Sequence, residues 1–219
     1  ELIVLDTTHP ATIERVVGQL ELGTTLFIVA SKSGGTTETL SHLAFFWDKV
    51  PNGTQFVAIT DPGTSLETLA RERGFRAVFV NPDDIGGRYS ALSYFGLVPA
   101  ALIGAPLHEV LDRAEEMQTA SERTIPAAQS PGATLGAMMG ESARAGRDKL
   151  TIALPEEIAS FGSWVEQLIA ESTGKERVGI VPVVGDFGGP KAVRRVGEYV
   201  REHGDRIHAV SPHRRSTTR

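Results

Sequence analysis

A loop rich in hydroxyl and glycine residues is the first feature of the chain that could bind a ligand. It reads Ser31-Lys32-Ser33-Gly34-Gly35-Thr36-Thr37 and lies between a predicted strand and a predicted helix. In open α/β sheets, ligands bind at the carboxyl ends of the strands, which is where a loop from strand to helix lies. Hydroxyl donors, glycines and the free N–H groups of a helix start suit a phosphate monoester. An ordinary turn with an N-cap has the same composition, so both interpretations stay open at this point.

The spacing of this loop argues against two common phosphate motifs. It fits neither the Walker A loop nor the G-x-G-x-x-G fingerprint, which disfavours ATP and NAD as ligands.

An arginine follows two glycines in the block Asp84-Ile85-Gly86-Gly87-Arg88-Tyr89-Ser90. This block comes directly after an apolar run that we interpret as a strand. Arginine stays charged and presents several donors, so Arg88 could stabilise a developing oxyanion at the sheet edge. A surface arginine in a loop is the alternative.

A carboxylate near the end of a predicted helix is the candidate general base. Ser163, Gln167 and Glu171 recur with helical spacing, beside an apolar stripe of Phe161, Trp164, Val165 and Leu168 that we expect to be buried. Glu171 falls in the last turn before Gly174, where a carboxylate meets the unfavourable end of the helix dipole. A lone glutamate on a helix is usually a solvated charge, so this pattern alone does not identify a base.

These blocks together resemble the glucose-6-phosphate isomerase family. Ser31-x-Ser33-Gly34-x-Thr36 is similar to the phosphate loop of sugar isomerase (SIS) domains, and Asp84 to Ser90 resembles a signature block of the isomerases. The segment from Phe161 to Lys175 is similar to the part that carries the family's catalytic glutamate. The resemblance covers roughly residues 1 to 185, and the last block looks like the isomerase half of bacterial transaldolase–isomerase fusions.

The resemblance implies interconversion of glucose 6-phosphate and fructose 6-phosphate through an enediolate. Glu171 would move the proton between C1 and C2, and Arg88 would stabilise the charge of the enediolate. The implied substrate-binding residues are Ser31, Lys32, Ser33, Gly34, Gly35, Thr36 and Gln167. No metal or organic cofactor is implied. The substrate would be a hexose 6-phosphate, the full-length enzyme a homodimer, and its location the cytoplasm.

Several family elements have no match in this chain. We find no glycine- and serine-rich loop before the first strand, no family context for the ring-opening histidine, and no carboxyl-terminal lysine block. The unmatched histidines are His9, His42, His108, His203, His208 and His213. We therefore expect a fragment of an isomerase. Truncation, a split gene and a degenerate paralogue all remain open.

Apolar runs alternate with amphipathic stretches over the first ninety residues. The expected strands are Leu2–Leu5, Leu26–Ala30, Phe56–Thr60 and Ala77–Val80. Helical patterns follow each of the first three, and the third contains a Thr64/Glu67 capping box and stops at Gly74. Unbroken apolar strands between such helices indicate a parallel sheet covered on both faces.

The strand pattern then stops and later restarts. Expected helices are Leu92–Leu102, which reads as buried, Leu107–Thr119 and Ala133–Ala145. From about residue 148 we expect strands at Leu150–Leu154, Ile180–Val184 and Ile207–Val210. Helices are expected at Glu157–Ser172 and around Val193, Val196 and Val200. The predicted fold is α/β, a doubly wound parallel sheet of the SIS or flavodoxin-like kind. We expect residues 1–120 to form a first SIS-type sugar-phosphate-binding domain that lacks its first strand and loop. Residues 121–219 are expected to form a helical connection and the start of a second SIS-type domain.

Composition excludes several classes of function. The 219 residues carry a net charge of −5 and no cysteine. Clustered positive charge is needed for nucleic-acid binding, and thiolates for disulfides or thiolate metal sites, so none of these is expected. No apolar run approaches the roughly 20 residues that span a bilayer, and no secretory signal opens the chain.

Two other functions fit the same residues. A non-catalytic sugar-phosphate sensor needs only the phosphate loop, and a turnover assay would separate it from an isomerase. An isomerase of broader scope, which also accepts mannose 6-phosphate, is the second alternative, because the choice of epimer depends on pocket shape.

Overall fold

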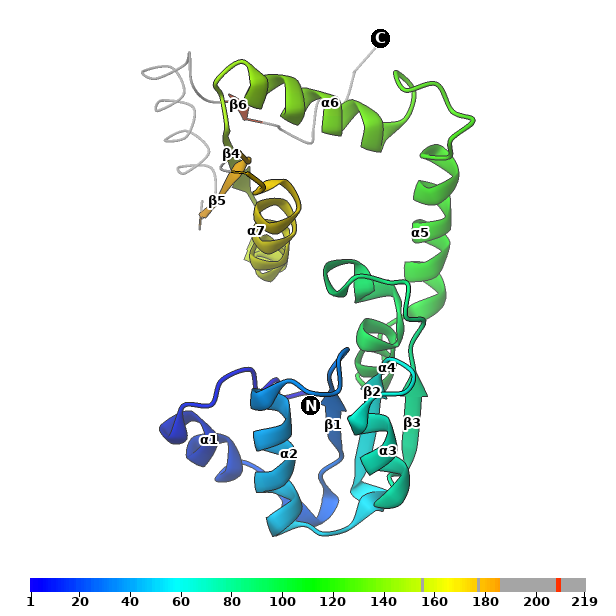
Figure 1. The fold of residues 1–219 in the computed structure, drawn as a ribbon, viewed down its shortest axis with the longest axis vertical. Helices are drawn as coiled ribbons and strands as arrows, with labels where there is room; N and C mark the ends of the chain where they lie inside the picture. The colour runs from blue at the N-terminus through cyan, green and yellow to red at the C-terminus, as the bar shows by residue number, and fades with distance from the viewer. Residues whose placement is uncertain (155, 177, 186–207, 210–219) are drawn as a thin grey trace. The chain divides into compact units, whose positions relative to one another are not determined.

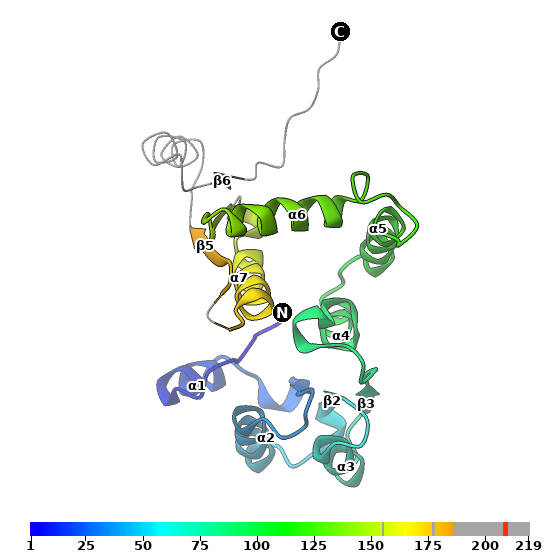
Figure 2. The same cartoon turned by 45° about the horizontal axis from the view of Figure 1, so that its top comes forward.

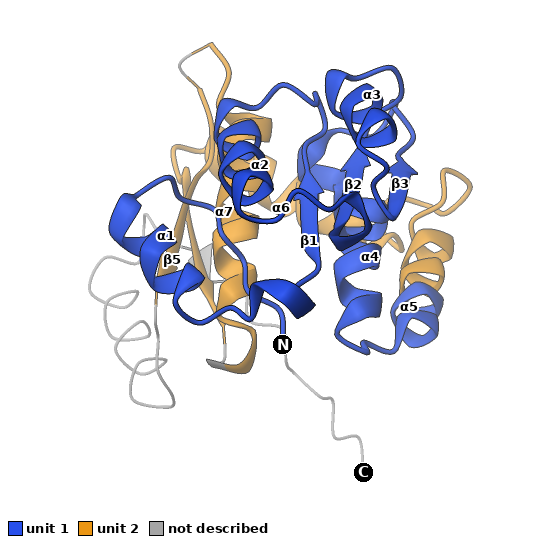
Figure 3. Cartoon of the chain, turned by 90° about the horizontal axis from the view of Figure 1, so that it is seen from below, with its two compact units in different colours: residues 1–113 blue, residues 114–219 orange. Residues whose placement is uncertain are grey.

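The structure is a computed structural model that describes residues 1–154, 156–176, 178–185 and 208–209. The chain forms two compact units, residues 1–113 and 114–219, coloured separately in Figure 3. The division falls within helix α5 (Leu107–Ala120), whereas the domain boundary predicted after residue 120 stands at the end of this helix and stays a prediction.

The first unit is built on a parallel sheet. Its strands β1 (Phe27–Ala30), β2 (Phe56–Thr60) and β3 (Ala77–Val80) pair in the order β1-β2-β3 (Figure 1). Ala30 stands opposite Ile59 and Thr60 opposite Val80, so the carboxyl ends of all three strands lie together at one edge. The sequence prediction of these three strands is confirmed.

Helices connect the strands and line both sheet faces. They are α1 (Pro10–Val17), η1 (Leu22–Thr24), α2 (Thr37–Lys49), η2 (Gly53–Gln55), α3 (Ser65–Glu72), η3 (Gly87–Leu92) and α4 (Tyr94–Leu102). Helices α2 and α3 pack on one face of the sheet. Helix α4 contacts β2 on the opposite face, where the rings of Tyr94 and of Phe79 in β3 lie with their centroids 5.5 Å apart. Helices on both faces of a parallel sheet confirm the predicted α/β fold class.

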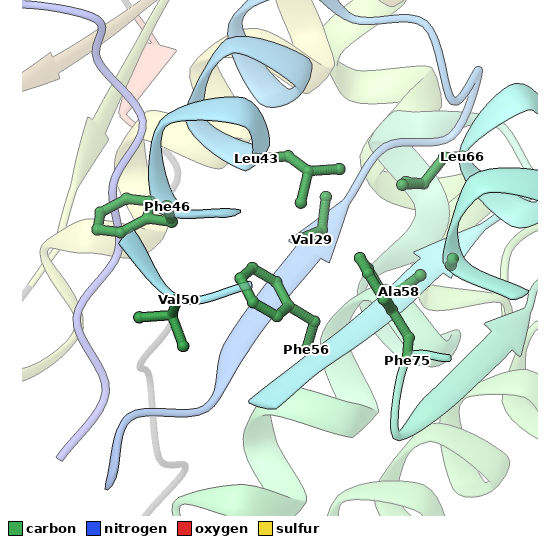
Figure 4. Close-up of a cluster of buried hydrophobic side chains, with 9 residues drawn as sticks. Val29, Leu43, Phe46, Val50, Phe56, Ala58, Leu66 and Phe75 are labelled. Carbon is green, nitrogen blue, oxygen red and sulfur yellow. The ribbon is translucent and has the colours of Figure 1, made fainter. Parts of the chain in front are cut away.

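The main core lies between the sheet and helices α2 and α3. Figure 4 shows Leu43 and Phe46 of α2 against Val29 of β1 and Phe56 of β2, with Leu66 of α3 beyond Ala58. Phe56, Ala58 and Leu66 have no exposed surface. Truncating a buried phenylalanine to alanine costs about 3–5 kcal/mol, so Phe56 alone accounts for a large share of the stability of a small unit.

Helix α3 has both of its ends fixed by local sequence. Thr64 Oγ1 accepts the N–H of Glu67 at 3.2 Å, as predicted, but Glu67 Oε2 accepts the N–H of Gly63 at 2.7 Å rather than that of Thr64. At the other end Gly74 has φ +63°, and the N–H groups of Gly74 and Phe75 bond to Arg71 and Ala70. This is a Schellman motif, which places Phe75 in the core.

The second unit repeats the parallel pattern. Strands β4 (Lys149–Ala153), β5 (Val181–Gly185) and β6 (His208–Ala209) pair in the order β5-β4-β6 among the described residues. The helices are α6 (Pro131–Arg144), η4 (Glu156–Ile158) and α7 (Ser160–Thr173). Figure 2 shows α7 beside β5, which it contacts. The predicted restart of strands near residue 148 is confirmed, and the helix expected around Val193, Val196 and Val200 lies outside the described residues.

Two local predictions are wrong. Leu2–Leu5 forms no strand, since no described strand pairs with it, and Val4 is 74% exposed. The segment has the composition of a strand, but among the described residues it has no neighbouring strand with which to form backbone hydrogen bonds. Helix α4 begins at Tyr94 rather than Leu92 and is not buried. Leu102 is 55% exposed, and Tyr94 is 43% exposed even though its ring contacts Phe79 of the sheet.

Among the described residues, none of the helices has both the length and the apolar character needed to cross a membrane.

Candidate active site

Gly34 sets the shape of the loop between β1 and α2. Its φ of +66° lies in the left-handed region that favours glycine. A Cβ at this position would stand 2.8 Å from Thr64 Oγ1, whereas a Cβ at Gly35 would approach nothing closer than 4.0 Å. Of these two positions, only that of Gly34 therefore requires a glycine. Its buried position brings the loop against the turn that follows β2.

The hydroxyl groups of the loop form hydrogen bonds within the loop, at the carboxyl edge of the sheet. Ser31 is 5% exposed, and its Oγ lies 2.8 Å from Thr36 Oγ1. Ser33 Oγ accepts the N–H of Gly35 at 3.3 Å. Thr36 is the N-cap of α2, yet among the described residues its side chain caps no helical N–H group. The first turn of α2 thus retains donors for a ligand, and the positive end of the helix dipole favours an anion there.

The turn after β2 contacts the loop and fixes its conformation. Thr60 Oγ1 lies 2.8 Å from Thr64 Oγ1, and Ser65 Oγ donates to the carbonyl oxygen of Gly34 at 3.0 Å. Thr64, which Gly34 packs against, is also the N-cap of α3. The loop conformation is thereby tied to the start of a second helix.

Lys32 connects the ends of all three strands. Its Nζ forms an ion pair with Asp61, in the turn after β2, and donates at 3.3 Å to the carbonyl oxygen of Asp83, in the loop after β3. The N–H of Asp61 donates in return to the carbonyl oxygen of Lys32 at 3.2 Å.

Arg88 lies in η3, in the same unit as the loop. Two polar residues with little exposed surface fix this segment from behind. Asn81, 2% exposed, accepts the N–H of Tyr94 at 3.2 Å, and Ser93 donates from Oγ to the carbonyl oxygen of Ser90 at 2.7 Å. Arg88 itself is half-buried. Neither Gly86 nor Gly87 has a positive φ. Gly87 instead leaves open space, since no atom would lie within 4 Å of a Cβ there.

Gln167 and Glu171 lie in α7 of the second unit, one turn apart. Gln167 Nε2 donates to Glu171 Oε1 at 2.9 Å, and both side chains are exposed in this structure. The helix ends at Thr173 with Gly174 as its C-cap, so Glu171 is in the last turn, as predicted.

The predicted buried face of α7 is wrong in part. Phe161 and Trp164 are 48% and 37% exposed, and their rings pack on each other with centroids 5.1 Å apart. Gly162 is the buried residue, because its missing side chain lets the helix approach Leu154 and Val184 closely. The large apolar residues suggest one packed face, but the small residue beside them determines the approach.

The sequence analysis did not assign to the site four residues that support it, namely Asp61, Thr64, Asn81 and Ser93. Asp61 and Asn81 each follow a predicted strand directly, which is the signal that could have identified them. Nothing local indicated that Asp61 pairs with Lys32, because the two residues lie on different connections.

Hollows occur in the second unit, beside helices α6 and α7. One of about 310 Å³ is lined by Met138, Met139, Glu141, Ser142, Arg147, Lys149, Leu150 and Ile180. Another, of about 510 Å³, is lined on the α7 side by Glu166, Ala170 and Gly174. The described residues contain no cluster of three or more His, Asp or Glu side chains suited to a metal ion.

Comparison with known proteins identifies the family. The profile of the family described as phosphoglucose isomerase matches residues 1–184. The chain belongs to the phosphoglucose isomerase family. Glucose-6-phosphate isomerase from Synechococcus sp. (strain JA-3-3Ab) is 38% identical over 182 residues, which are 78% of this chain and 34% of that protein. The corresponding enzyme of Thermosynechococcus vestitus is 38% identical over 181 residues.

Solved structures share the fold of this chain. A hypothetical protein from Thermus thermophilus superposes with a TM-score of 0.80 at 30% identity, over 90% of this chain and 49% of that chain. A glucose-6-phosphate isomerase from Chlamydia trachomatis gives 0.71 at 24% identity, over 89% and 40%, and supports the fold. The chain spans about a third of the length of its curated phosphoglucose isomerase relatives.

Proposed function

We propose that this chain provides the phosphate loop, the enediolate-stabilising arginine and the general base of an aldose–ketose isomerase. Its substrates would be glucose 6-phosphate and fructose 6-phosphate. Membership of the phosphoglucose isomerase family supports a sugar-phosphate substrate. The geometry of the loop from Ser31 to Thr36 carries the proposal, because it combines hydroxyl groups with a helix start whose N-cap side chain is engaged elsewhere.

The phosphate binds at this loop. Ser33 and Thr36 are exposed and able to donate, and Ser31 orients Thr36 through their mutual hydrogen bond. Gly34 and Gly35 allow the backbone to approach the phosphate oxygens. Each charge-assisted hydrogen bond contributes about 1.5–3 kcal/mol, so a few of them suffice for micromolar binding.

Proton transfer between C1 and C2 is assigned to Glu171. The carboxylate removes the proton from one carbon and returns it to the other, through a cis-enediolate. Gln167 holds Glu171 by the hydrogen bond at 2.9 Å and contacts the sugar. Arg88 balances the negative charge of the enediolate oxygens. The proposal requires all three side chains to reach one substrate, and a homodimer of the full-length enzyme is part of it.

Calorimetric titration of 6-phosphogluconate into the 219-residue chain tests the phosphate site. Native protein should bind, and Ser33→Ala with Thr36→Val should weaken binding by at least about tenfold, the equivalent of one lost charge-assisted hydrogen bond. Thr24→Ala is a matched control, because Thr24 is an exposed hydroxyl of the same unit in η1. Equal binding by the native and double-variant proteins would contradict the assignment. A turnover assay then separates an isomerase from a sugar-phosphate sensor.

A further inference from the structure

We propose that Lys32 is a positioning residue rather than a ligand of the substrate. With Asp61 it forms a clamp that holds the three connections at the carboxyl edge of the first sheet in register. This role rests on the proposed sugar-phosphate site, because it concerns how the phosphate loop and the segment carrying Arg88 keep their relative places.

The contacts of Lys32 are all made to neighbouring connections. Its Nζ pairs with the carboxylate of Asp61 and donates to the carbonyl oxygen of Asp83 at 3.3 Å. The backbone bond from Asp61 N to Lys32 O, at 3.2 Å, closes a second link between the first two connections. The lysine thus joins the phosphate loop to the turn after β2 and to the chain that leads into η3.

Asp61 is the more buried partner of this ion pair. The side chain of Lys32 is 34% exposed and that of Asp61 is 13% exposed. Asp61 Oδ1 is buried and accepts no hydrogen bond within the described part of the chain. If Lys32 turned toward a phosphate, a poorly solvated carboxylate would lose its cation beside an incoming anion. Leaving this mostly buried carboxylate without its cation is unfavourable, so the arrangement favours keeping Lys32 on Asp61.

Asp61→Asn distinguishes the two roles, since they predict opposite signs. If Lys32 bound the phosphate directly, the substitution would release the amine and remove a nearby negative charge, and 6-phosphogluconate would bind equally well or more tightly. If Lys32 is part of a clamp, Asp61→Asn weakens binding, roughly three- to thirtyfold for groups in direct contact. Lys32→Met should weaken it by a similar factor, and the double variant should be no weaker than the weaker single variant.

The measurements are calorimetric titrations of 6-phosphogluconate into the full chain. Lys32→Arg, which keeps a cation for Asp61, should retain most of the affinity. Arg71→Gln is the matched control, because it removes the Arg71–Glu67 ion pair of the same unit without touching Lys32. Unchanged or tighter binding by Asp61→Asn, or additive losses in the double variant, would overturn the clamp.

A second readout uses the ligand-free protein and separates this inference from the proposed function. Opening the clamp should speed amide hydrogen exchange in residues 31–37 and 83–92 of Asp61→Asn, with β2 unchanged as the internal reference. Equal exchange in native and Asp61→Asn proteins would disprove the clamp, whatever the protein binds. Failure of the native chain to bind 6-phosphogluconate would instead disprove the phosphate site. Circular dichroism confirms that each variant is folded, and if Lys32→Met does not fold, Asp61→Asn alone decides.

Discussion

At the scale of the residue, Gly34 and Gly35 look alike in the sequence and differ in the structure. We expect Gly34→Ala to destabilise the protein by at least about 1–2 kcal/mol, the cost of the left-handed conformation, with the contact to Thr64 adding to it. It should also abolish 6-phosphogluconate binding. Gly35→Ala is the control and should change stability little. Urea unfolding of both variants provides the measurement, and equal midpoints would refute the geometric argument.

Glu171 is the residue on which the proposed chemistry depends. In a full-length isomerase that contains this chain, Glu171→Gln keeps the shape of the side chain and removes the base. Deuterium washout from C2 of labelled glucose 6-phosphate should therefore slow by about 10²–10⁴-fold, with 6-phosphogluconate binding nearly unchanged. Glu166→Gln, an exposed glutamate of the same helix, should exchange normally. Exchange by Glu171→Gln at the native rate would remove Glu171 from the mechanism.

Local composition marks candidate site residues, and their roles stay predictions. Glycines and hydroxyl groups between a strand and a helix indicated the candidate loop, which the structure places between β1 and α2, and Arg88 follows the next glycine pair. The support of the site was not predictable in this way. The Lys32–Asp61 pair depends on which strand ends are neighbours, and that is set by sheet order rather than by any local pattern.

At the scale of the element, the carboxyl group of Glu67 in helix α3 should make the stability of the protein depend on pH. A hydrogen bond from Arg71, and then one from the backbone of Gly63, hold the pKa of Glu67 below its ordinary value. A carboxyl whose pKa falls on folding stabilises the native state above its unfolded pKa of about 4.3. That contribution disappears as the pH falls through the lower folded pKa.

We therefore expect the native protein to be more stable than Glu67→Gln at pH 6, and the difference to vanish at low pH. Urea unfolding between pH 3 and pH 6 measures it, with Glu72→Gln, on the same helix, as the control for loss of one charge. A constant difference across this range would show that Glu67 acts through packing instead of through its charge.

Elements were predictable where their pattern is complete within the segment itself. Strands β2 and β3 were placed correctly because each is an unbroken apolar run between turn residues. Leu2–Leu5 has the same composition but needs a neighbouring strand, which no local pattern supplies. On α7 the large apolar residues suggested the packed face, whereas the close approach at Gly162 decides it.

At the scale of the whole molecule, the chain spans about a third of the length of its curated relatives. Residues that act together in an active site lose activity out of proportion when some are missing. We expect this chain alone to be a poor isomerase, with turnover far below the enzyme median of about 10 s⁻¹. A coupled assay for glucose 6-phosphate formation measures it. Turnover near that median would show that residues of this chain replace the expected histidine and lysine.

If phosphate binds as proposed, the open first turn of α2 makes the stability of the folded state depend on anions in solution. Because Thr36 engages its hydroxyl group with Ser31, a phosphate bound there would take the place of the missing cap, and the unfolded chain would not bind it. Mass action then raises the free energy of unfolding by about 2.7 kcal/mol when the ligand is at about one hundred times its Kd. The melting temperature should accordingly climb with inorganic phosphate and stay constant with chloride at equal ionic strength, and Ser33→Ala with Thr36→Val should lose that response.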